Sequence, residues 1–276
     1  MPSPDATVLE LHGESVPIAT LLRDIWRQRG ITWMLANRDF RARYRSSNLG
    51  LVWSILLPFV QGSILAVVFT RVVRIHTGVN YPIYVLLGTT LWGYFSAAFT
   101  GAATAIVGQS SITGRLYFPR ILVTGSPVLS GLPSYLLSTL VLVVLMPIFG
   151  VHYRWQLLAL PVAVLLSMIL ATVLGASVAI LHVYVRDVAY AITAGMQVWY
   201  YATPVIYPLT LAHEFSGWLT ANPMTGVLQL AHWSVFGQAQ GALAAPLIAT
   251  VAWIVALTGL ALLVYRRYER IACDRL

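Results

Sequence analysis

Long apolar stretches without any charged residue alternate along the chain with short segments that carry arginine. A membrane-spanning helix needs about 20 mostly apolar residues. Six stretches meet this requirement, so the pattern predicts an all-α integral membrane protein with six transmembrane helices. We expect these helices at residues 49–70, 82–107, 122–149, 156–183, 189–210 and 242–265.

The overall composition supports this interpretation. Of the 276 residues, 58% are hydrophobic and only 9% are charged, whereas soluble domains carry about 25% charged residues. Such a chain cannot cover a globule with polar side chains, which excludes a soluble enzyme. The first 16 residues hold three acidic side chains and lack the basic-then-apolar order of a secretory signal peptide, so we expect none.

The distribution of arginine predicts how the spans are oriented. All 17 basic residues are arginines, and arginine-rich loops stay on the cytoplasmic side of a membrane. With six spans, fourteen arginines fall on the side that holds both termini and three fall on the other side. We therefore expect a multi-pass protein of the cytoplasmic (inner) membrane with both termini in the cytoplasm. This placement favours a lipid partner and argues against nucleic acid.

Two regions differ from the spans in their pattern. In residues 18–45, apolar residues at helical spacing lie beside arginines, which predicts an amphipathic helix in the plane of the membrane interface, interrupted at Gly30. A cytoplasmic tail held by anionic lipid is the alternative. The predicted organisation is a cytoplasmic N-terminal segment at 1–45, a transmembrane domain at 46–265 and a cytoplasmic tail at 266–276.

The second such region, residues 210–241, is too polar to span lipid and too apolar for a free loop. Pro204 and Pro208 precede it and interrupt the fifth span near its outer end. Irregular backbone is tolerated at membrane depth only where protein encloses it. We expect a pair of short re-entrant helices at the outer face, before the last span.

Few residues in this chain could perform catalysis. No acidic residue lies within a predicted span, and the six histidines show no metal-ligand spacing. We therefore expect no catalytic residue and no metal site. The chain has no lysine for a phosphate-binding P-loop, so ATP and magnesium would be bound by a separate polypeptide. The lack of acidic or basic side chains inside the spans argues against ion-coupled transport.

Aromatic and amide side chains recur at helical spacing in the second and fifth predicted spans. Aromatic rings can pack on the C–H faces of sugars, and tyrosine and glutamine can hydrogen-bond to sugar hydroxyls. Packing between helices, or an interfacial aromatic belt, is the alternative. The candidate channel residues are Trp92, Phe95, Phe99, Gln197, Trp199, Tyr200 and Tyr201.

Three motifs follow one another along the chain. The first is R-D-F-R-A-R-Y-R-S-S-N-L-G at 38–50, with Trp53 and Pro58 after it, and the second is Y-F-P-R at 117–120. The third begins with R-D at 186–187 and continues with P-V-I-Y-P at 204–208 and N-P-M at 222–224. Together they resemble the permease of ABC-2 type exporters that move O-antigen, teichoic acid and related lipid-linked polysaccharides.

The resemblance implies an ABC-2 permease fold and a function in exporting a lipid-linked polysaccharide. It implies a homodimer bound to two copies of a cognate ATPase, with a coupling loop at 108–120 and an outer gate region at 210–241. An ABC-2 permease for drugs or lipids, and an integral-membrane glycosyltransferase, are the alternatives. Members of the family often carry an arginine after N-P-M, where this chain has L-Q-L-A-H-W at 228–233, so no role is transferred for it.

The resemblance and the residue types together assign candidate roles. The residues expected to contact the ATPase are Arg115, Tyr117, Phe118, Pro119, Arg120, Arg186 and Asp187. The resemblance adds Trp53 to the substrate channel. The interface helix and the segment that leads into the first span contribute Trp26, Arg38, Arg41, Arg43 and Tyr44. The outer gate contributes Pro204, Tyr207, Asn222 and Pro223.

Overall fold

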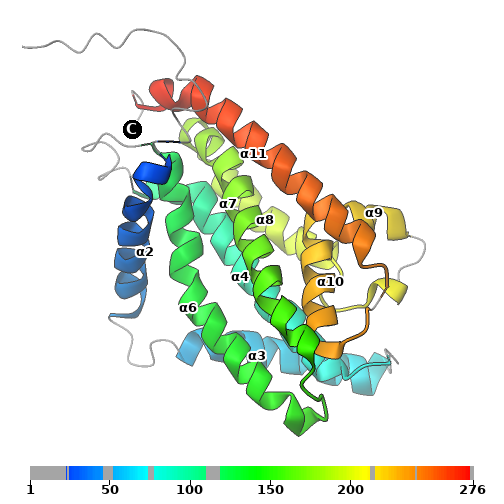
Figure 1. The fold of residues 1–276 in the computed structure, drawn as a ribbon. Coiled ribbons are helices and arrows are strands. Elements are labelled where there is room, and N and C mark those ends of the chain that lie inside the picture. Colours follow the sequence, from blue (N-terminus) through cyan, green and yellow to red (C-terminus); the bar gives the residue numbers. More distant parts are fainter. Residues whose placement is uncertain are drawn as a thin grey trace, which may run out of the picture.

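The computed structural model describes residues 23, 25–45, 52–73, 78–109, 119–211, 215–239 and 241–273, and in these residues all regular structure is helical. Figure 1 shows the longer helices packed side by side. The helices are α2 (Arg29–Tyr44), α3 (Val52–Val67), α4 (Tyr81–Gly108), α6 (Ile121–Leu145), α7 (Leu160–Tyr184), α8 (Val188–Tyr201), α9 (Ser216–Ala221), α10 (Pro223–Phe236) and α11 (Ala244–Cys273).

Four helical segments in the described part are long and apolar enough to cross a membrane. They correspond to the predicted spans at 82–107, 122–149, 156–183 and 242–265, and their bounds are Tyr81–Gly108, Ile121–Phe149, Trp155–Tyr184 and Ala244–Arg266. At a rise of 1.5 Å per residue, α4 alone is about 42 Å long, which exceeds the ~30 Å hydrocarbon core of a bilayer. These four predictions are confirmed to within a few residues.

The other two predicted spans form shorter helices. A continuous helix over 189–210 is wrong in its second half, because α8 ends at Tyr201 and the chain then turns. Pro204 explains the end, since a proline disfavours helical backbone at the residue before it. α8 covers about 21 Å. The first span is represented by α3, which a π-helix at Val68–Val73 extends, and its apolar part, Leu56–Thr70, is also short.

α4 forms the centre of the helix assembly. It packs against α3, α6, α7, α8 and α10, and side chains such as Tyr84 and Phe95 are completely buried in it. Because lipid tails are as apolar as leucine, close approach of small residues supplies much of the packing in membranes. Gly175 of α7 shows this, since an added Cβ there would lie 2.4 Å from the Cβ of Ala102 on α4.

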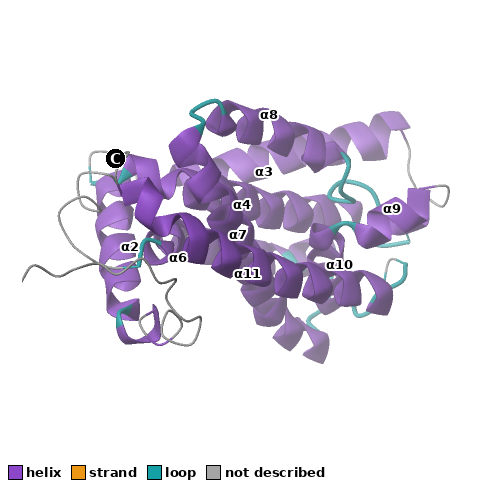
Figure 2. Ribbon diagram, turned by 90° about the horizontal axis from the view of Figure 1, so that it is seen from above, coloured by secondary structure: helices purple, strands orange, loops and turns teal. Residues whose placement is uncertain are grey.

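α2 lies at one end of the assembly and crosses the direction of the long helices (Figure 2). Leu35 and Ala36 are buried, Trp33 and Met34 are exposed, and the Thr32 hydroxyl donates to the Leu122 carbonyl of α6 at 3.0 Å. The predicted break at Gly30 is wrong, because the helix runs through this residue and the turn lies at Gln28. An apolar exposed face beside arginines fits a helix lying in the membrane interface.

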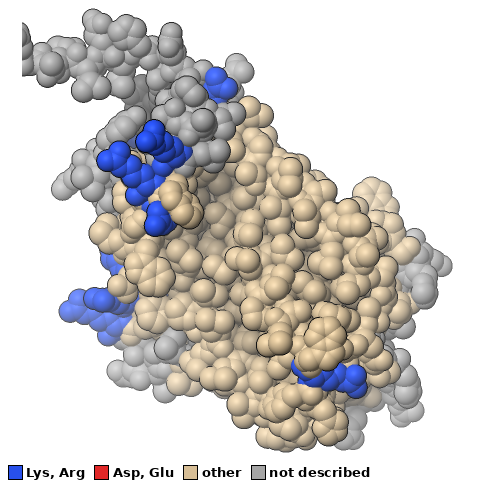
Figure 3. All heavy atoms as spheres, in the orientation of Figure 1, with Lys and Arg blue, Asp and Glu red and all other residues tan. Residues whose placement is uncertain are grey.

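Arginine side chains gather at the end of the molecule that holds α2. On the face drawn in Figure 3, most of the blue atoms lie over this end, one further group lies at the opposite end, and uncharged surface separates them. Arg120 at the start of α6, Arg186 after α7 and Arg266 near the end of α11 belong to the same end. We call it the arginine-rich end; Arg154, between α6 and α7, lies at the other.

The segment between α8 and α11 contains two helices, as expected. α9 has only 6 residues, whereas α10 has 14, of which all but Pro223 and Trp233 are buried. α10 packs against α4, α7 and α11. Protein therefore encloses α10 on several sides.

Candidate functional site

Aromatic side chains from α4 and α8 meet in one packed cluster. The Trp199 ring lies 5.7 Å from Trp92 and 5.5 Å from Phe95, edge to face in both cases, and Tyr200 lies 5.8 Å from Trp92. Such geometry is the preferred arrangement for aromatic pairs. Trp92, Phe95 and Tyr200 are buried, so their role in this structure is to join α8 to α4.

This burial corrects the expected channel wall. Phe99 is also buried and stacks beyond Phe95, but with Trp199 it lines an open, mainly apolar cavity between α7, α8 and α11, whereas Trp92 and Phe95 face protein. The helical spacing correctly grouped the side chains on shared faces, but the faces point inward. Of the channel candidates, Trp53, Gln197 and Tyr201 are exposed, and Trp199 is partly buried.

α8 presents a separate, outward face with hydrogen-bonding side chains. Tyr190, Thr193, Gln197 and Tyr201 recur at steps of three or four residues, and all four are exposed. The Thr193 hydroxyl donates to the Ala189 carbonyl within the helix at 3.0 Å, whereas an exposed amide such as that of Gln197 would lack partners in hydrocarbon. This face therefore requires protein, water or a polar ligand beside it.

Asn222 connects the end of α8 to the start of α10. Its Oδ1 accepts from the Trp199 indole N–H at 3.2 Å and from the Met224 backbone N–H at 3.0 Å. Its amide nitrogen donates to the Thr203 hydroxyl at 2.8 Å and to the Ala202 carbonyl at 3.2 Å. One side chain thus caps α10 and fixes the turn that follows α8.

The beginning of α4 holds the same turn from the other side. The Tyr81 hydroxyl donates to the Ile206 carbonyl at 2.6 Å, and the Tyr84 hydroxyl donates to the Tyr207 carbonyl at 3.1 Å. The backbone passes so close to α4 that a Cβ on Gly88 would lie 2.4 Å from the Val205 carbonyl oxygen. The expected gate segment is therefore tightly bound to the core in this conformation.

The stretch at 228–233, after N-P-M, contains a histidine with a packing role. His232 on α10 is fully buried. Its ring stacks on Tyr84 with centroids 3.8 Å apart and planes 8° from parallel. Its Nε2 lies 3.1 Å from the Tyr84 carbonyl oxygen. His232 therefore joins α10 to α4.

A second site lies at the arginine-rich end, around Asp39 of α2. One carboxylate oxygen pairs with Arg38 at 2.8 Å. The other accepts from the Gln109 amide at 3.0 Å and from the Ser126 hydroxyl at 3.2 Å. Gln109 follows α4 and Ser126 lies in the second turn of α6, so Asp39 joins α2 to both helices that flank the expected coupling loop.

The structure describes only some of the residues expected to contact the ATPase, and these differ in exposure. Arg115, Tyr117 and Phe118 lie outside the described residues. Pro119 is partly exposed, Arg120 is buried, and Arg186 and Asp187 are exposed at the start of α8. Among residues whose side chains the structure describes, the one ion pair is Arg38–Asp39, so Arg186 and Asp187 form no such pair there.

The N-terminal candidates lie along α2 and its approach. The Arg29 guanidinium lies 4.5 Å from the centre of the exposed Trp26 ring, Arg41 and Arg43 are exposed, and Tyr44 is half-buried. The sequence motif contained Asp39 but did not indicate its role, because its partners lie 70 and 87 residues further along the chain. No local signal in the sequence links these positions.

Comparison with known proteins identifies the family to which this chain belongs. The chain matches the family described as ABC-2 type transporter over residues 31–236. It belongs to the ABC-2 type transporter family, and is thus a multi-pass membrane component of a transporter system that works with a partner ATPase. The matched region begins in α2 and ends with α10, so it contains the Asp39 site, the α8 face and the Asn222 turn.

Individual relatives support the same assignment. The chain is 30% identical over 240 residues to the O-antigen export system permease protein RfbA of Myxococcus xanthus, covering 86% of this chain and 92% of that protein. It is 24% identical over 200 residues to a Klebsiella pneumoniae protein of the same name, covering 71% of this chain and 76% of that protein.

Proposed function

We propose that this chain is the permease subunit of an ABC exporter that moves O-antigen, or a related lipid-linked polysaccharide, across the cytoplasmic membrane. The observation that carries the proposal is similarity over nearly the whole length of a protein named as an O-antigen export permease. The permease itself performs no catalysis, and two copies of a separate ATPase bind ATP and magnesium.

The arrangement in the membrane follows from the distribution of charge. The arginine-rich end faces the cytoplasm, with α2 in the membrane interface and both termini on this side. α3 and α8 are the two remaining crossings, which brings the number to six. Because both helices are short, the non-helical backbone at their ends must be covered by protein, and a second copy of the chain covers it in the assembled transporter.

The polymer path lies along the exposed face of α8. Thr193, Gln197 and Tyr201 turn outward from the helix, and a second copy facing them would enclose a passage with neutral polar and aromatic walls. A long chain must be held weakly at each point so that it can move on. The buried aromatic cluster behind α8 keeps the face in position, and the turn held by Asn222 forms the outer gate.

Coupling to ATP hydrolysis uses the arginine-rich end. The loop between α4 and α6 meets the ATPase, together with Arg186 and Asp187 at the start of α8. Asp39 ties the flanks of this loop to α2, so a displacement of the loop is passed to the interface helix as well as to α4 and α6.

Deletion of the gene for this chain is expected to abolish surface polysaccharide while lipid-linked polymer accumulates inside the cell. Loss of an exporter blocks a step that follows polymer synthesis, so polymer still forms inside the cell. Loss of a glycosyltransferase would remove the intracellular polymer too. Immunoblots of intact and lysed cells distinguish the two results. Unchanged surface polysaccharide would contradict the proposal and favour a drug or lipid exporter.

A cysteine at position 197 is expected to form covalent dimers when a short thiol cross-linker is added to membranes. The native Cys273 is first replaced by serine, since it is the single cysteine of the chain. Met196→Cys is the matched control, because Met196 is adjacent to Gln197 but buried. Equal dimer formation by both variants, measured on denaturing gels, would contradict the placement of α8 at the partner.

A further inference from the structure

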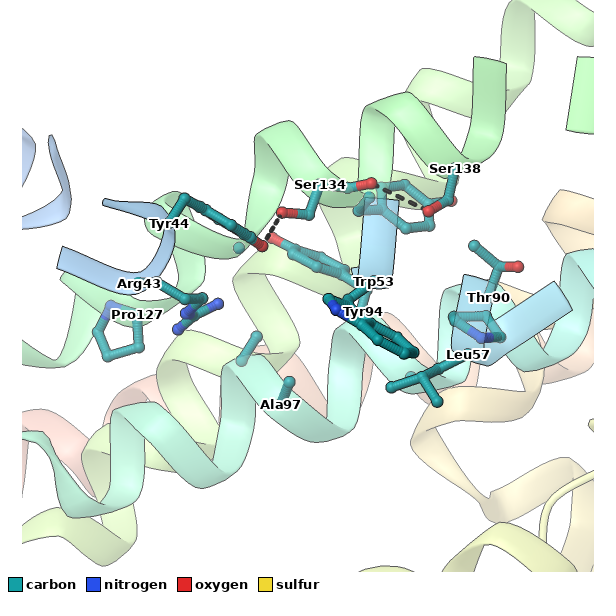
Figure 4. A pocket seen from close by; sticks show the side chains of 15 residues that line it. Arg43, Tyr44, Trp53, Leu57, Thr90, Tyr94, Ala97, Pro127, Ser134 and Ser138 are labelled. Carbon is teal, nitrogen blue, oxygen red and sulfur yellow. Dashed lines mark hydrogen bonds between the residues drawn. The ribbon is translucent and has the colours of Figure 1, made fainter. Parts of the chain in front are cut away.

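A cavity of about 260 Å³ lies where α2, α3, α4 and α6 meet, away from the α8 face (Figure 4). Arginine and tyrosine from α2, aromatic and aliphatic side chains from α3, and hydroxyl-bearing side chains from α4 and α6 form its walls. Residues that matter for the argument are Arg43, Tyr44, Leu57, Thr90, Tyr94 and Ser134.

One end of this cavity carries a positive charge. Arg43 is exposed, and within the described part of the chain no acidic side chain forms an ion pair with it. The hydroxyl groups of Tyr44 and Ser134 are hydrogen-bonded to each other nearby. A guanidinium beside hydroxyl groups at a membrane interface is suited to a phosphate group.

The cavity extends from this charged end toward the apolar interior. Its lining on α6 runs from Pro127, in the second turn, to Ser138, a distance of about 16 Å along the helix axis. Leu57 of α3 and Ala97 of α4 line the walls, and Figure 4 shows Arg43 and Thr90 toward opposite ends. A charged end followed by mainly apolar walls matches the phosphate of a lipid followed by its glycerol and the start of its acyl chains.

The deep end contains a hydrogen-bond donor without an acceptor. The Thr90 side chain is 4% exposed, and its hydroxyl has no partner among the described residues. The neighbouring Thr89 differs, because its hydroxyl donates to the Val85 carbonyl at 2.8 Å. A buried donor of this kind requires an acceptor. The ester carbonyls of a glycerophospholipid lie below its phosphate and supply one, whereas an isoprenoid chain has none.

We propose that this cavity binds the phosphate–glycerol part of one glycerophospholipid of the membrane, whose phosphate pairs with Arg43 and whose ester carbonyl accepts a hydrogen bond from Thr90. The lipid would fill the space between the interface helix and the first spans. The proposal does not depend on the export function, because the experiment that tests it measures lipid binding and not export.

The test is native mass spectrometry of the purified permease–ATPase complex titrated with phosphatidylglycerol in detergent. Arg43→Gln is expected to weaken binding about fivefold, the effect of removing one interfacial cation. Thr90→Val, which keeps the shape of the side chain, is expected to weaken it about threefold, as for loss of one hydrogen bond. Two matched controls, Arg45→Gln on the same helix and Thr89→Val beside Thr90, should leave binding unchanged.

A second titration uses undecaprenyl phosphate, which carries a phosphate but no ester carbonyl. Weaker binding of this lipid, with no response to Thr90→Val, supports the proposal. Binding that equals or exceeds that of phosphatidylglycerol would overturn it in favour of an isoprenoid ligand. Equal losses of lipid binding in Arg43→Gln and Arg45→Gln would also overturn it, because they would show that the lipid responds to the overall positive charge of this surface and not to Arg43. If Arg43→Gln does not assemble, the Thr90 and Thr89 pair decides the outcome alone.

Discussion

Replacing Asp39 by alanine is expected to reduce polysaccharide export about tenfold while the amount of permease in the membrane stays near normal. The Asp39 carboxylate accepts hydrogen bonds from Gln109 and Ser126, on the two sides of the expected coupling loop. Because this group is partly exposed, we take its contribution to holding the loop as about 1.5 kcal/mol, which corresponds to roughly a tenfold change in population. Surface polysaccharide and ATP hydrolysis by the reconstituted complex would be measured together.

Arg38→Gln is the matched control for this prediction. It removes the ion pair of Asp39 but leaves both hydrogen bonds to Gln109 and Ser126, and exposed ion pairs contribute little. We expect it to export at close to the normal rate. Equal defects in the two variants would show that the charge pair matters and would contradict a role for Asp39 in holding the loop. Ser126→Ala combined with Asp39→Ala should add little to the single change.

Replacing Asn222 by alanine is expected to destabilise the outer segment by about 3 kcal/mol and to abolish export. The change removes the cap of α10, which is worth about 1 kcal/mol. It also leaves the Trp199 indole without a partner, at a cost of about 1 kcal/mol. The hydrogen bonds that the amide donates to the Thr203 hydroxyl and the Ala202 carbonyl are lost as well, at about 0.5 kcal/mol each. Limited proteolysis of membranes, read beside surface polysaccharide, should show new cleavage between α8 and α10.

Asn222→Ser separates capping from bridging. Serine caps a helix nearly as well as asparagine, but its single hydroxyl cannot contact Trp199, Thr203 and the start of α10 together. We expect this variant to keep α10 intact and to remain defective in export. Normal export by Asn222→Ser would show that the cap alone is needed and that the bridge to α8 has no functional role.

Sequence pattern was sufficient for the four long helices because their apolar runs are separated by arginines or, before α11, by polar and helix-breaking residues. α4, for example, was expected at 82–107 and extends over Tyr81–Gly108. The end of α8 was harder to predict from the sequence. Pro204 indicated the break in the fifth span and accounts for the end of α8. Hydropathy continues through the turn, however, and the path of the turn is fixed by its contacts with Tyr81, Tyr84 and Asn222.

The prediction of the site was limited mainly because the sequence does not show what each helix face meets. Helical spacing places Trp92, Phe95 and Phe99 on one side of α4, but spacing is the same whether that side meets protein or a channel. Their burial follows from helices that surround α4 on several sides, which one-dimensional pattern does not contain. The same holds for Asp39, whose partners come from distant segments, and for the unpartnered hydroxyl of Thr90.

The enclosure of α10 has a consequence for biogenesis. Gln229 and His232 are fully buried on this helix, and helices of such polarity do not partition into lipid alone. The walls around α10 include α11, which the ribosome completes after α10. α4 and α7, which also pack on α10, precede it in the chain, so the last wall of this enclosure is supplied by the final helix, which closes the subunit around the buried amide and imidazole.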